Sequence, residues 1–127
     1  NPLLIEGQIV GGAAQGIGGA LLEEFVYDES MQPLATSFMD YLLPTITELP
    51  HIELLLREDA PSGTNPLGIK GAGEGGITAV GAAVAAAVDD ALGRTECVNR
   101  LPISAARMHE ILKAKLSRPT DVKAVNL

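Results

Sequence analysis

The sequence predicts an α+β fold in which helices pack on one face of a small antiparallel sheet. Apolar residues recur at helical spacing in three stretches, while three other stretches are short, apolar and bordered by turn residues. The expected elements therefore follow one another as one helix, three strands and two helices. With 127 residues, the chain suits a single domain covering residues 1–127.

A helix and a hairpin are expected in the N-terminal part of the chain. An apolar side chain recurs at every fourth position over residues 7–24, which is typical of one buried helix face. These side chains are Ile9, Ala13, Ile17 and Leu21. Residues 25–27 and 33–38 are expected to form two short strands, because the polar residues 28–30 between them favour a turn.

A third strand is expected over residues 52–57. Its three consecutive leucines, Leu54, Leu55 and Leu56, indicate a place in the centre of the sheet. Residues 41–50 contain two prolines and are expected to be irregular. Residues 58–70 are rich in Pro, Gly, Ser, Thr and Asn, which predicts a loop.

The C-terminal part predicts two helices. Over residues 75–92 a valine stripe recurs at every fourth position among alanines, and Gly93 is placed to end the helix. Residues 95–98 fit a short strand. Ser104 is suited to cap a last helix, which runs to about residue 115. Residues 117–127 are expected to be a tail.

The composition excludes several classes of function. Nine basic against sixteen acidic residues give a net charge of −7, which disfavours nucleic acid as a partner. The single cysteine, Cys97, excludes a disulfide framework and a cysteine-built metal site. His51 and His109 lack the spacing of a helical metal site. The most apolar stretch ends at Asp89 after twelve residues, so we expect no transmembrane segment. The start of the chain does not resemble a signal peptide, which suggests a cytoplasmic location.

Thirteen of the fourteen glycines lie in two windows, six within residues 7–19 and seven within residues 63–81. Glycine inside a helix costs about 1 kcal/mol relative to alanine, so such clusters need a reason. One reason is the close approach of a ligand or another backbone segment. The alternative is tight helix packing or flexible loops.

Glu74 is the sharpest candidate for chemistry, because it is a lone carboxylate among glycines at the start of an alanine-rich helix. A helix N-terminus lowers the pKa of a carboxylate and burial raises it. A glutamate held between these effects can act as a general base near neutral pH. The alternative is a solvated loop carboxylate that helps to cap the helix.

Two further features of the glycine windows concern binding. Gln15 is the only hydrogen-bonding side chain between Val10 and Leu22, and its amide both donates and accepts. The alternative for Gln15 is an exposed polar residue on an amphipathic helix. The pattern G-x-G-x-x-G also occurs from residue 71 to residue 76, but a long loop separates it from the preceding strand. A dinucleotide-binding module is therefore a weaker alternative.

Taken together, the two windows resemble a known family. Residues 7–18 read GQIVGGAAQGIG and continue to Glu24, and residues 65–76 read NPLGIKGAGEGG. Both segments, and the helix start at residues 101–104, resemble the C-terminal part of the large subunit of molybdenum hydroxylases. This is the family of xanthine dehydrogenase, aldehyde oxidase and aerobic carbon monoxide dehydrogenase. The resemblance covers residues 6–112, and the second segment is more similar to bacterial members.

The resemblance implies an oxidoreductase that oxidises a substrate carbon with oxygen derived from water. It implies a molybdopterin cofactor carrying molybdenum, commonly the cytosine dinucleotide form in bacterial enzymes. No side chain ligates the metal in this family. The resemblance places Glu74 as the base that activates the oxygen nucleophile. It places the following residues at the cofactor: Gln15, Gly16, Ile17, Gly18, Lys70, Gly71, Ala72 and Gly73.

The resemblance also implies partners, since the family's large subunit is several times longer than this chain. The remainder of that subunit, an iron–sulfur subunit and a flavin subunit with FAD are expected partners, together with a small-molecule substrate. The chain alone is expected to be inactive. The alternative is a non-catalytic interaction or assembly domain, or an isolated fragment without cofactor. Purines, aldehydes, N-heterocycles and carbon monoxide all remain open as substrates.

Overall fold

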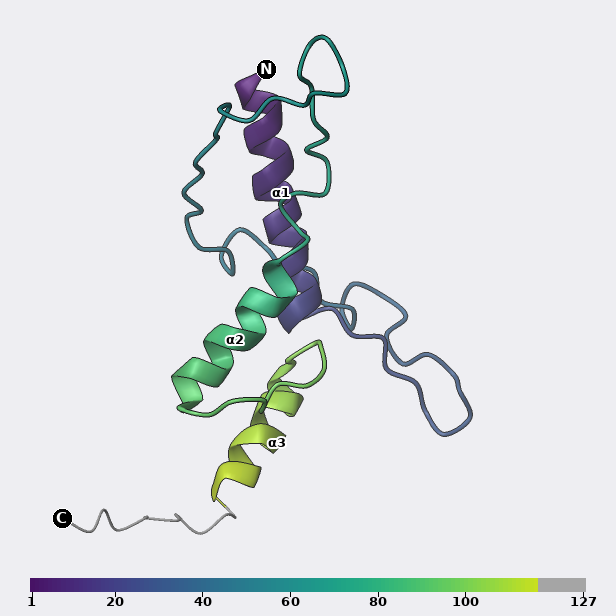
Figure 1. The fold of residues 1–127 in the computed structure, drawn as a ribbon. Helices are drawn as coiled ribbons and strands as arrows, with labels where there is room; N and C mark the ends of the chain where they lie inside the picture. Colours follow the sequence, from purple (N-terminus) through teal and green to yellow (C-terminus); the bar gives the residue numbers. More distant parts are fainter. Residues whose placement is uncertain (117–127) are drawn as a thin grey trace, which may run out of the picture.

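The computed structural model describes residues 1–116 and shows an open arrangement of three helices joined by long connections (Figure 1). The helices are α1 (Pro2–Leu21), α2 (Val80–Leu92) and α3 (Ala105–Leu116). The expected antiparallel sheet is not formed within the described residues, where pairing is limited to one isolated bridge. Within this part of the chain, no helix is long and apolar enough to cross a membrane. The expected tail over 117–127 lies outside the described residues.

α1 begins at Pro2 rather than residue 7 and ends at Leu21 rather than residue 24. The earlier start has a local cause, because the side chain of Asn1 accepts a hydrogen bond from the Leu3 N–H at 3.1 Å. Pro2 occupies the first helical position, where a missing N–H costs nothing. At the other end, the carbonyl of Gly18 accepts the final N–H groups and closes the helix.

α2 begins at Val80, five residues later than the pattern predicts, because residues 75–79 form turns. Gly75 and Gly76 in this stretch disfavour helix propagation. At its other end, Gly93 adopts the left-handed conformation, with φ 63° and ψ 36°, which confirms the predicted helix stop.

The expected strand over 95–98 is also absent. The backbone N–H groups of Cys97 and Val98 instead donate to the Asp89 carboxylate, each at 3.1 Å. This side chain therefore ties the following loop back to α2.

α3 confirms the last predicted helix almost residue for residue. The carbonyl of Ser104 accepts a hydrogen bond from the Met108 N–H at 2.8 Å, which forms the first turn. Just before this turn, Ile103 is 3% exposed and its N–H donates to the carbonyl of Ala20 at 2.7 Å. This contact joins the segment that leads into α3 to the C-terminal end of α1.

The buried core is small. Four apolar residues of the described chain are buried, namely Ala20, Ala35, Ile103 and Ile111. Many large apolar side chains remain exposed instead, especially in the connection between α1 and α2. The described residues therefore leave many of their large apolar side chains uncovered.

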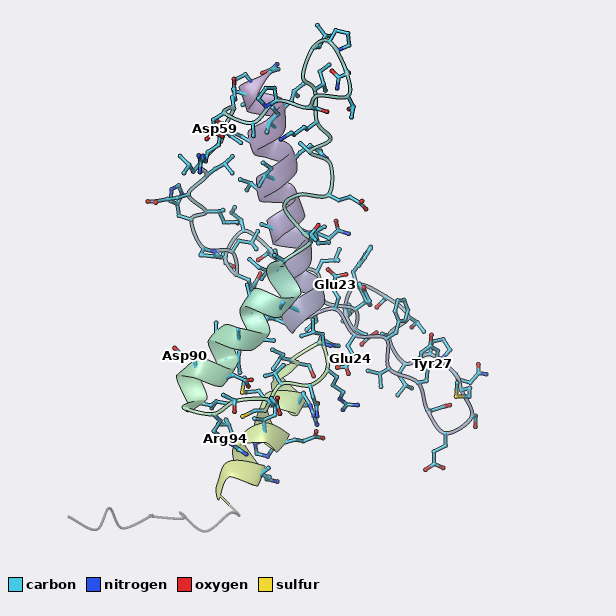
Figure 2. The ribbon with its side chains drawn as sticks, viewed as in Figure 1. Glu23, Glu24, Tyr27, Asp59, Asp90 and Arg94 are labelled. Atoms are coloured by element: carbon cyan, nitrogen blue, oxygen red, sulfur yellow. The ribbon has the colours of Figure 1, made fainter. Side chains whose placement is uncertain are left out.

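The predicted hairpin is an arm that extends away from the helices, with Tyr27 on it (Figure 2). The two expected strands are not formed, since their pairing is a single bridge between Tyr27 and Pro33. Proline has no backbone N–H, so it cannot continue a ladder of hydrogen bonds. The turn itself is formed as predicted, because the Asp28 carboxylate accepts from the N–H groups of Ser30 and Gln32 at 2.8 and 2.9 Å.

A hydrogen bond anchors the base of this arm to the end of α1. The Tyr41 hydroxyl donates to the Glu23 carboxylate at 2.7 Å, and its ring lies 5.0 Å from that of Phe25, centroid to centroid. This hydrogen bond, with partial burial and the negative charge of Glu23, raises the pKa of Tyr41 above its ordinary value.

The third expected strand, over residues 52–57, is not formed within the described chain. The segment runs back along α1 towards the N-terminal end of that helix (Figure 1). Along it, half-buried and exposed residues alternate from Ile52 to Arg57. The run of leucines predicted a continuously apolar strand in the centre of a sheet, whereas the segment alternates in exposure and has no partner strand within the described chain.

Candidate functional site

The two glycine windows meet where α1 crosses the turns that precede α2. A Cβ atom at Gly76 would lie 2.1 Å from the carbonyl oxygen of Ile9, and one at Gly12 would lie 3.2 Å from the Cα of Gly76. Both distances are shorter than ordinary contacts, so the two backbones approach as closely as glycine alone permits. At this crossing, tight packing accounts for the glycines.

Two of the glycines that the resemblance places at the cofactor are also packed. Gly16 is buried, and a Cβ there would lie 2.6 Å from the side chain of Val80 on α2. Gly18 is buried as well, against Glu23 and Pro44. Between them, Ile17 is half-buried. On this stretch of α1, Gly16 and Gly18 therefore pack against other parts of the chain.

Gln15 lies on the exposed side of the same helix. It lines an open groove of about 360 Å³ together with Gly19, Thr78 and Leu101. A Cβ at Gly19 would meet nothing within 4 Å, so the helix surface beside Gln15 is open. The amide of Gln15 is thus accessible to a polar ligand.

The loop before the second glycine window is built around Asn65. Its side-chain oxygen accepts from the N–H groups of Leu67 and Ile69 at 3.2 and 3.0 Å, and its amide nitrogen donates to the Ile69 carbonyl at 2.9 Å. Gly68 completes the turn with φ +65°, a conformation that suits glycine. Asn65 was not singled out from the sequence as the residue that shapes this loop, although Asn is a residue type that favours turns.

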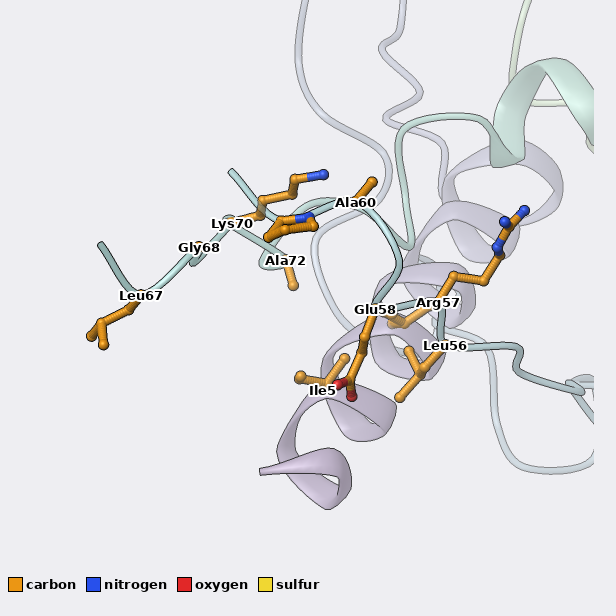
Figure 3. Close-up of a pocket in the computed structure, with 12 residues that line it drawn as sticks. Ile5, Leu56, Arg57, Glu58, Ala60, Leu67, Gly68, Lys70 and Ala72 are labelled. Atoms are coloured by element: carbon orange, nitrogen blue, oxygen red, sulfur yellow. The ribbon is translucent and has the colours of Figure 1, made fainter. Parts of the chain in front are cut away.

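This loop delivers Lys70, Gly71 and Ala72 to the wall of a second hollow, a cavity of about 430 Å³. In Figure 3, the side chains of Leu56 and Glu58 point towards Ile5 of α1, whereas that of Arg57 points away. A Cβ at Gly71 would meet nothing within 4 Å. The cavity is therefore bounded by α1, the extended segment 52–57 and the glycine loop.

Glu74 lies in sequence between residues that line the first hollow and residues that line the second, and it lines neither of them. Its side chain is exposed and makes no hydrogen bond or ion pair within the described residues. Its backbone carbonyl, in contrast, is engaged, accepting from the Ile77 N–H at 3.2 Å and the Thr78 hydroxyl at 2.8 Å. The backbone of Glu74 is thus fixed in a turn while its carboxylate is free to meet a ligand.

The backbone of the glycine loop offers donors. Within the described residues, no N–H group from 70 to 76 donates a hydrogen bond. The carbonyl of Gly73 accepts a long hydrogen bond, 3.5 Å, from the side chain of Gln8 on α1. Successive free N–H groups in a glycine-rich turn form a surface suited to oxygen-rich or anionic groups.

The structure therefore brings some of the predicted site residues together and keeps others apart. Lys70, Gly71 and Ala72 share one cavity, while Gln15 and Gly16 line the other groove. In residues 1–116, no group of three His, Cys, Asp or Glu side chains could hold a metal ion.

Several known proteins are similar to this chain. Residues 1–50 match the family described as molybdopterin cofactor-binding domain. Over 104 residues, the chain is 56% identical to subunit gamma of the 6-hydroxypseudooxynicotine dehydrogenase complex of Paenarthrobacter nicotinovorans. That match covers 82% of this chain and 13% of the relative. The large subunit of nicotine 6-hydroxylase from the same organism is 46% identical over 72% of this chain and 11% of its own length.

Solved structures give the same result at the level of the fold. The structure superposes on quinoline 2-oxidoreductase from Pseudomonas putida 86 with a TM-score of 0.82 and 43% identity, covering 94% of this chain and 15% of that one. A Cu,Mo-containing CO dehydrogenase gives a TM-score of 0.77 at 33% identity, over 90% of this chain and 14% of the other. The chain thus spans about one-seventh of the length of the proteins it matches.

Proposed function

The chain belongs to the family of large, molybdopterin-binding subunits of molybdenum hydroxylases, and from this premise we propose that it forms their cofactor-facing, base-bearing part. The proposed enzyme oxidises a carbon atom of a small-molecule substrate with oxygen derived from water. Because the chain spans 13% of its relative's length, the proposal assigns turnover to the assembled enzyme. Its partners would be the remainder of the large subunit, an iron–sulfur subunit and a flavin subunit with FAD, all in the cytoplasm.

The donor chemistry of the glycine loop fits the proposed cofactor. Molybdopterin carries phosphate, and its cytosine dinucleotide form carries a pyrophosphate. The free N–H groups over residues 70–76 and the charge of Lys70 suit such oxygen-rich groups. The open space beside Gly71 leaves room for close approach. This run of free N–H groups, with the exposed Glu74 within it, is the observation that carries the proposal.

The other proposed cofactor residues act through α1. Gln15 presents an amide that both donates and accepts, at an exposed point of the helix. Gly16, Ile17 and Gly18 are buried or half-buried. We therefore propose that they support the ligand by packing beneath it and do not hydrogen-bond to it through side chains. Gly73 accepts from Gln8, which ties the glycine loop to the same helix.

Glu74 is the proposed general base. When bound, the molybdenum cofactor supplies the redox chemistry of the reaction. Glu74 contributes by accepting a proton from the water-derived oxygen as that oxygen attacks the substrate carbon. Its backbone is fixed by hydrogen bonds from Ile77 and Thr78, while its carboxylate has no competing partner in the described chain. Both properties suit a base that must meet a reacting atom.

The test is the substitution Glu74→Gln in the assembled enzyme. Loss of the base should lower kcat by about a hundredfold to ten-thousandfold, while the molybdenum content, measured by elemental mass spectrometry, stays at the wild-type level. Glu29→Gln is the matched control, because Glu29 is an exposed glutamate in the arm. Retained turnover in Glu74→Gln would remove Glu74 from this role.

Molybdenum analysis also separates the proposal from its alternatives. A non-catalytic assembly domain predicts that an enzyme containing this chain carries no molybdenum. A dinucleotide-binding module predicts that the chain binds a free dinucleotide and tolerates Glu74→Gln. Stoichiometric molybdenum together with an inactive Glu74→Gln variant is the result expected here.

A further inference from the structure

The extended segment of residues 52–57 has the side-chain pattern of a sheet strand without having a sheet. Ile52, Leu54 and Leu56 are half-buried, whereas Glu53, Leu55 and Arg57 are exposed. Alternation with a period of two is the mark of a strand that covers a core with one face. Here that face lies towards α1, since Leu56 shares a cavity wall with Ile5 and Ile9.

The backbone of this segment has no partner within the described chain. Between the turn that ends at Glu48 and the loop that begins at Ser62, no backbone group takes part in a hydrogen bond. A row of unpaired N–H and C=O groups along an extended, apolar segment is a template for pairing with another strand. Such pairing is recognition by the main chain, so its partner must be an extended polypeptide.

The face that points away from α1 is apolar at its centre. Leu55 is 83% exposed, although it lies between two other leucines. At about 25 cal/mol per Å², covering such a side chain is favourable. The segment therefore lacks both a backbone partner at its edges and a cover for its outer face.

The described residues as a whole show the same shortage of cover, because four apolar residues are buried whereas nineteen large apolar side chains are exposed. A second copy of the chain is poorly suited to supply the cover, because each copy carries a net charge of −7. The structural relatives, in contrast, contain a polypeptide about seven times longer than the part that superposes on this chain.

From these observations we infer that residues 52–56 become a β-strand by pairing with a strand from the remainder of the large-subunit polypeptide. Ile52, Leu54 and Leu56 stay against α1, and Leu55 is covered by the added polypeptide. The inference rests on the proposed function, because that function supplies the partner. It adds the surface at which the partner docks and the kind of contact that it makes.

The first test is hydrogen exchange of the amides of residues 51–57. The chain alone should exchange them as fast as an unstructured peptide. In the complex with the remaining large-subunit polypeptide, exchange should slow by at least about tenfold. Amides that stay unprotected in the assembled complex would overturn the inference. Protection that appears in the chain alone as its concentration rises would assign the edge to a second copy, which also overturns it.

The second test uses proline to separate backbone pairing from apolar contact. Leu55→Pro removes the N–H group and should weaken association with the remaining polypeptide by at least about tenfold, whereas Leu55→Ala keeps the backbone and should weaken it less. Ile46→Pro is the matched control, because Ile46 is 86% exposed and follows Thr45 in a turn, where proline is accepted. Equal association of Leu55→Pro and Ile46→Pro would contradict the strand.

The outcomes also distinguish this inference from the proposed function. A complex that contains molybdenum but leaves residues 51–57 unprotected overturns the strand alone. A complex with protected amides and no molybdenum overturns the proposed function and leaves the strand in place. Failure of the two polypeptides to associate overturns both.

Discussion

Among the glycines, Gly76 has the least room for a side chain, since a Cβ atom there would lie 2.1 Å from the Ile9 carbonyl oxygen. Gly76→Ala should therefore force the crossing apart and destabilise the chain by about 1–3 kcal/mol, the usual cost of overpacking. Thermal unfolding followed by circular dichroism at 222 nm measures this loss.

Gly11→Ala is the matched control for this substitution. A Cβ at Gly11 meets nothing within 4 Å, and alanine favours a helix by about 1 kcal/mol relative to glycine. Gly11→Ala should therefore raise the midpoint of unfolding while Gly76→Ala lowers it. Midpoints that move together in the two variants would show that the crossing is less tight than described.

Tyr41 gives a prediction about pH. The hydrogen bond to Glu23 raises the pKa of Tyr41, so the folded chain favours the protonated phenol more than the unfolded chain does. The stabilisation is complete below the ordinary tyrosine pKa of about 10 and is lost as the pH rises through the raised pKa. Unfolding midpoints measured between these limits should fall with pH.

The ionisation itself can be followed by phenolate absorbance at 295 nm. Tyr27→Phe leaves Tyr41 as the only tyrosine of the chain. In that background, Glu23→Ala should move the titration to lower pH, because it removes both the hydrogen-bond acceptor and the negative charge. An unchanged titration curve would show that Glu23 does not control Tyr41.

At the scale of the elements, the helices were predictable because their signals are local. Gly93 ends α2 as expected, and α3 begins next to Ser104. The start of α1 was missed although Asn1 and Pro2 are a cap and a first-turn residue, because the apolar period was read from residue 7 onwards. α2 starts late because the turn at residues 75–76 packs against the backbone of α1. A local sequence pattern does not reveal such a tertiary contact.

The strands were predicted less well because a strand needs a partner that the local sequence does not specify. The arm turns at Asp28, as the residue types predict. Residues 52–57 alternate in exposure, although their three consecutive leucines predicted a place in the centre of a sheet. Hydrogen-bonded pairing, however, depends on chain segments far apart in sequence or outside this chain. Pattern alone therefore predicted an extended segment here, and the expected sheet is not formed within the described residues.

The candidate site was only partly predictable, because residue type is visible in the sequence whereas packing and loop shape are not. Glu74 and Gln15 stood out by residue type, and both are exposed in the structure. The packing of Gly16 against Val80 was covered only by the general alternative of tight helix packing. The role of Asn65 in shaping the loop before Lys70 was missed, because a single polar residue in a polar loop gives little contrast.

For the molecule as a whole, the small core predicts that the chain alone exposes apolar surface to which other apolar molecules bind. Side chains such as Phe38, Met39 and Ile46 are at least 80% exposed. Large exposed apolar patches mark surfaces that another protein covers. The chain alone should therefore bind the apolar dye ANS strongly, and its fluorescence should fall when the remaining large-subunit polypeptide is added. Weak dye binding by the chain alone would contradict this expectation.

The crossing of Gly12 and Gly76 has a mechanical consequence. Gln15 follows Gly12 by about one helical turn, and Glu74 precedes Gly76 by two residues. With backbone pressed on backbone, no side-chain rotamer can absorb a sliding motion between the two segments. A displacement of α1 would therefore move Glu74 together with Gln15, and the two side chains would keep their relative positions. The alignment of the two side chains thus depends on residues that have no side chains of their own.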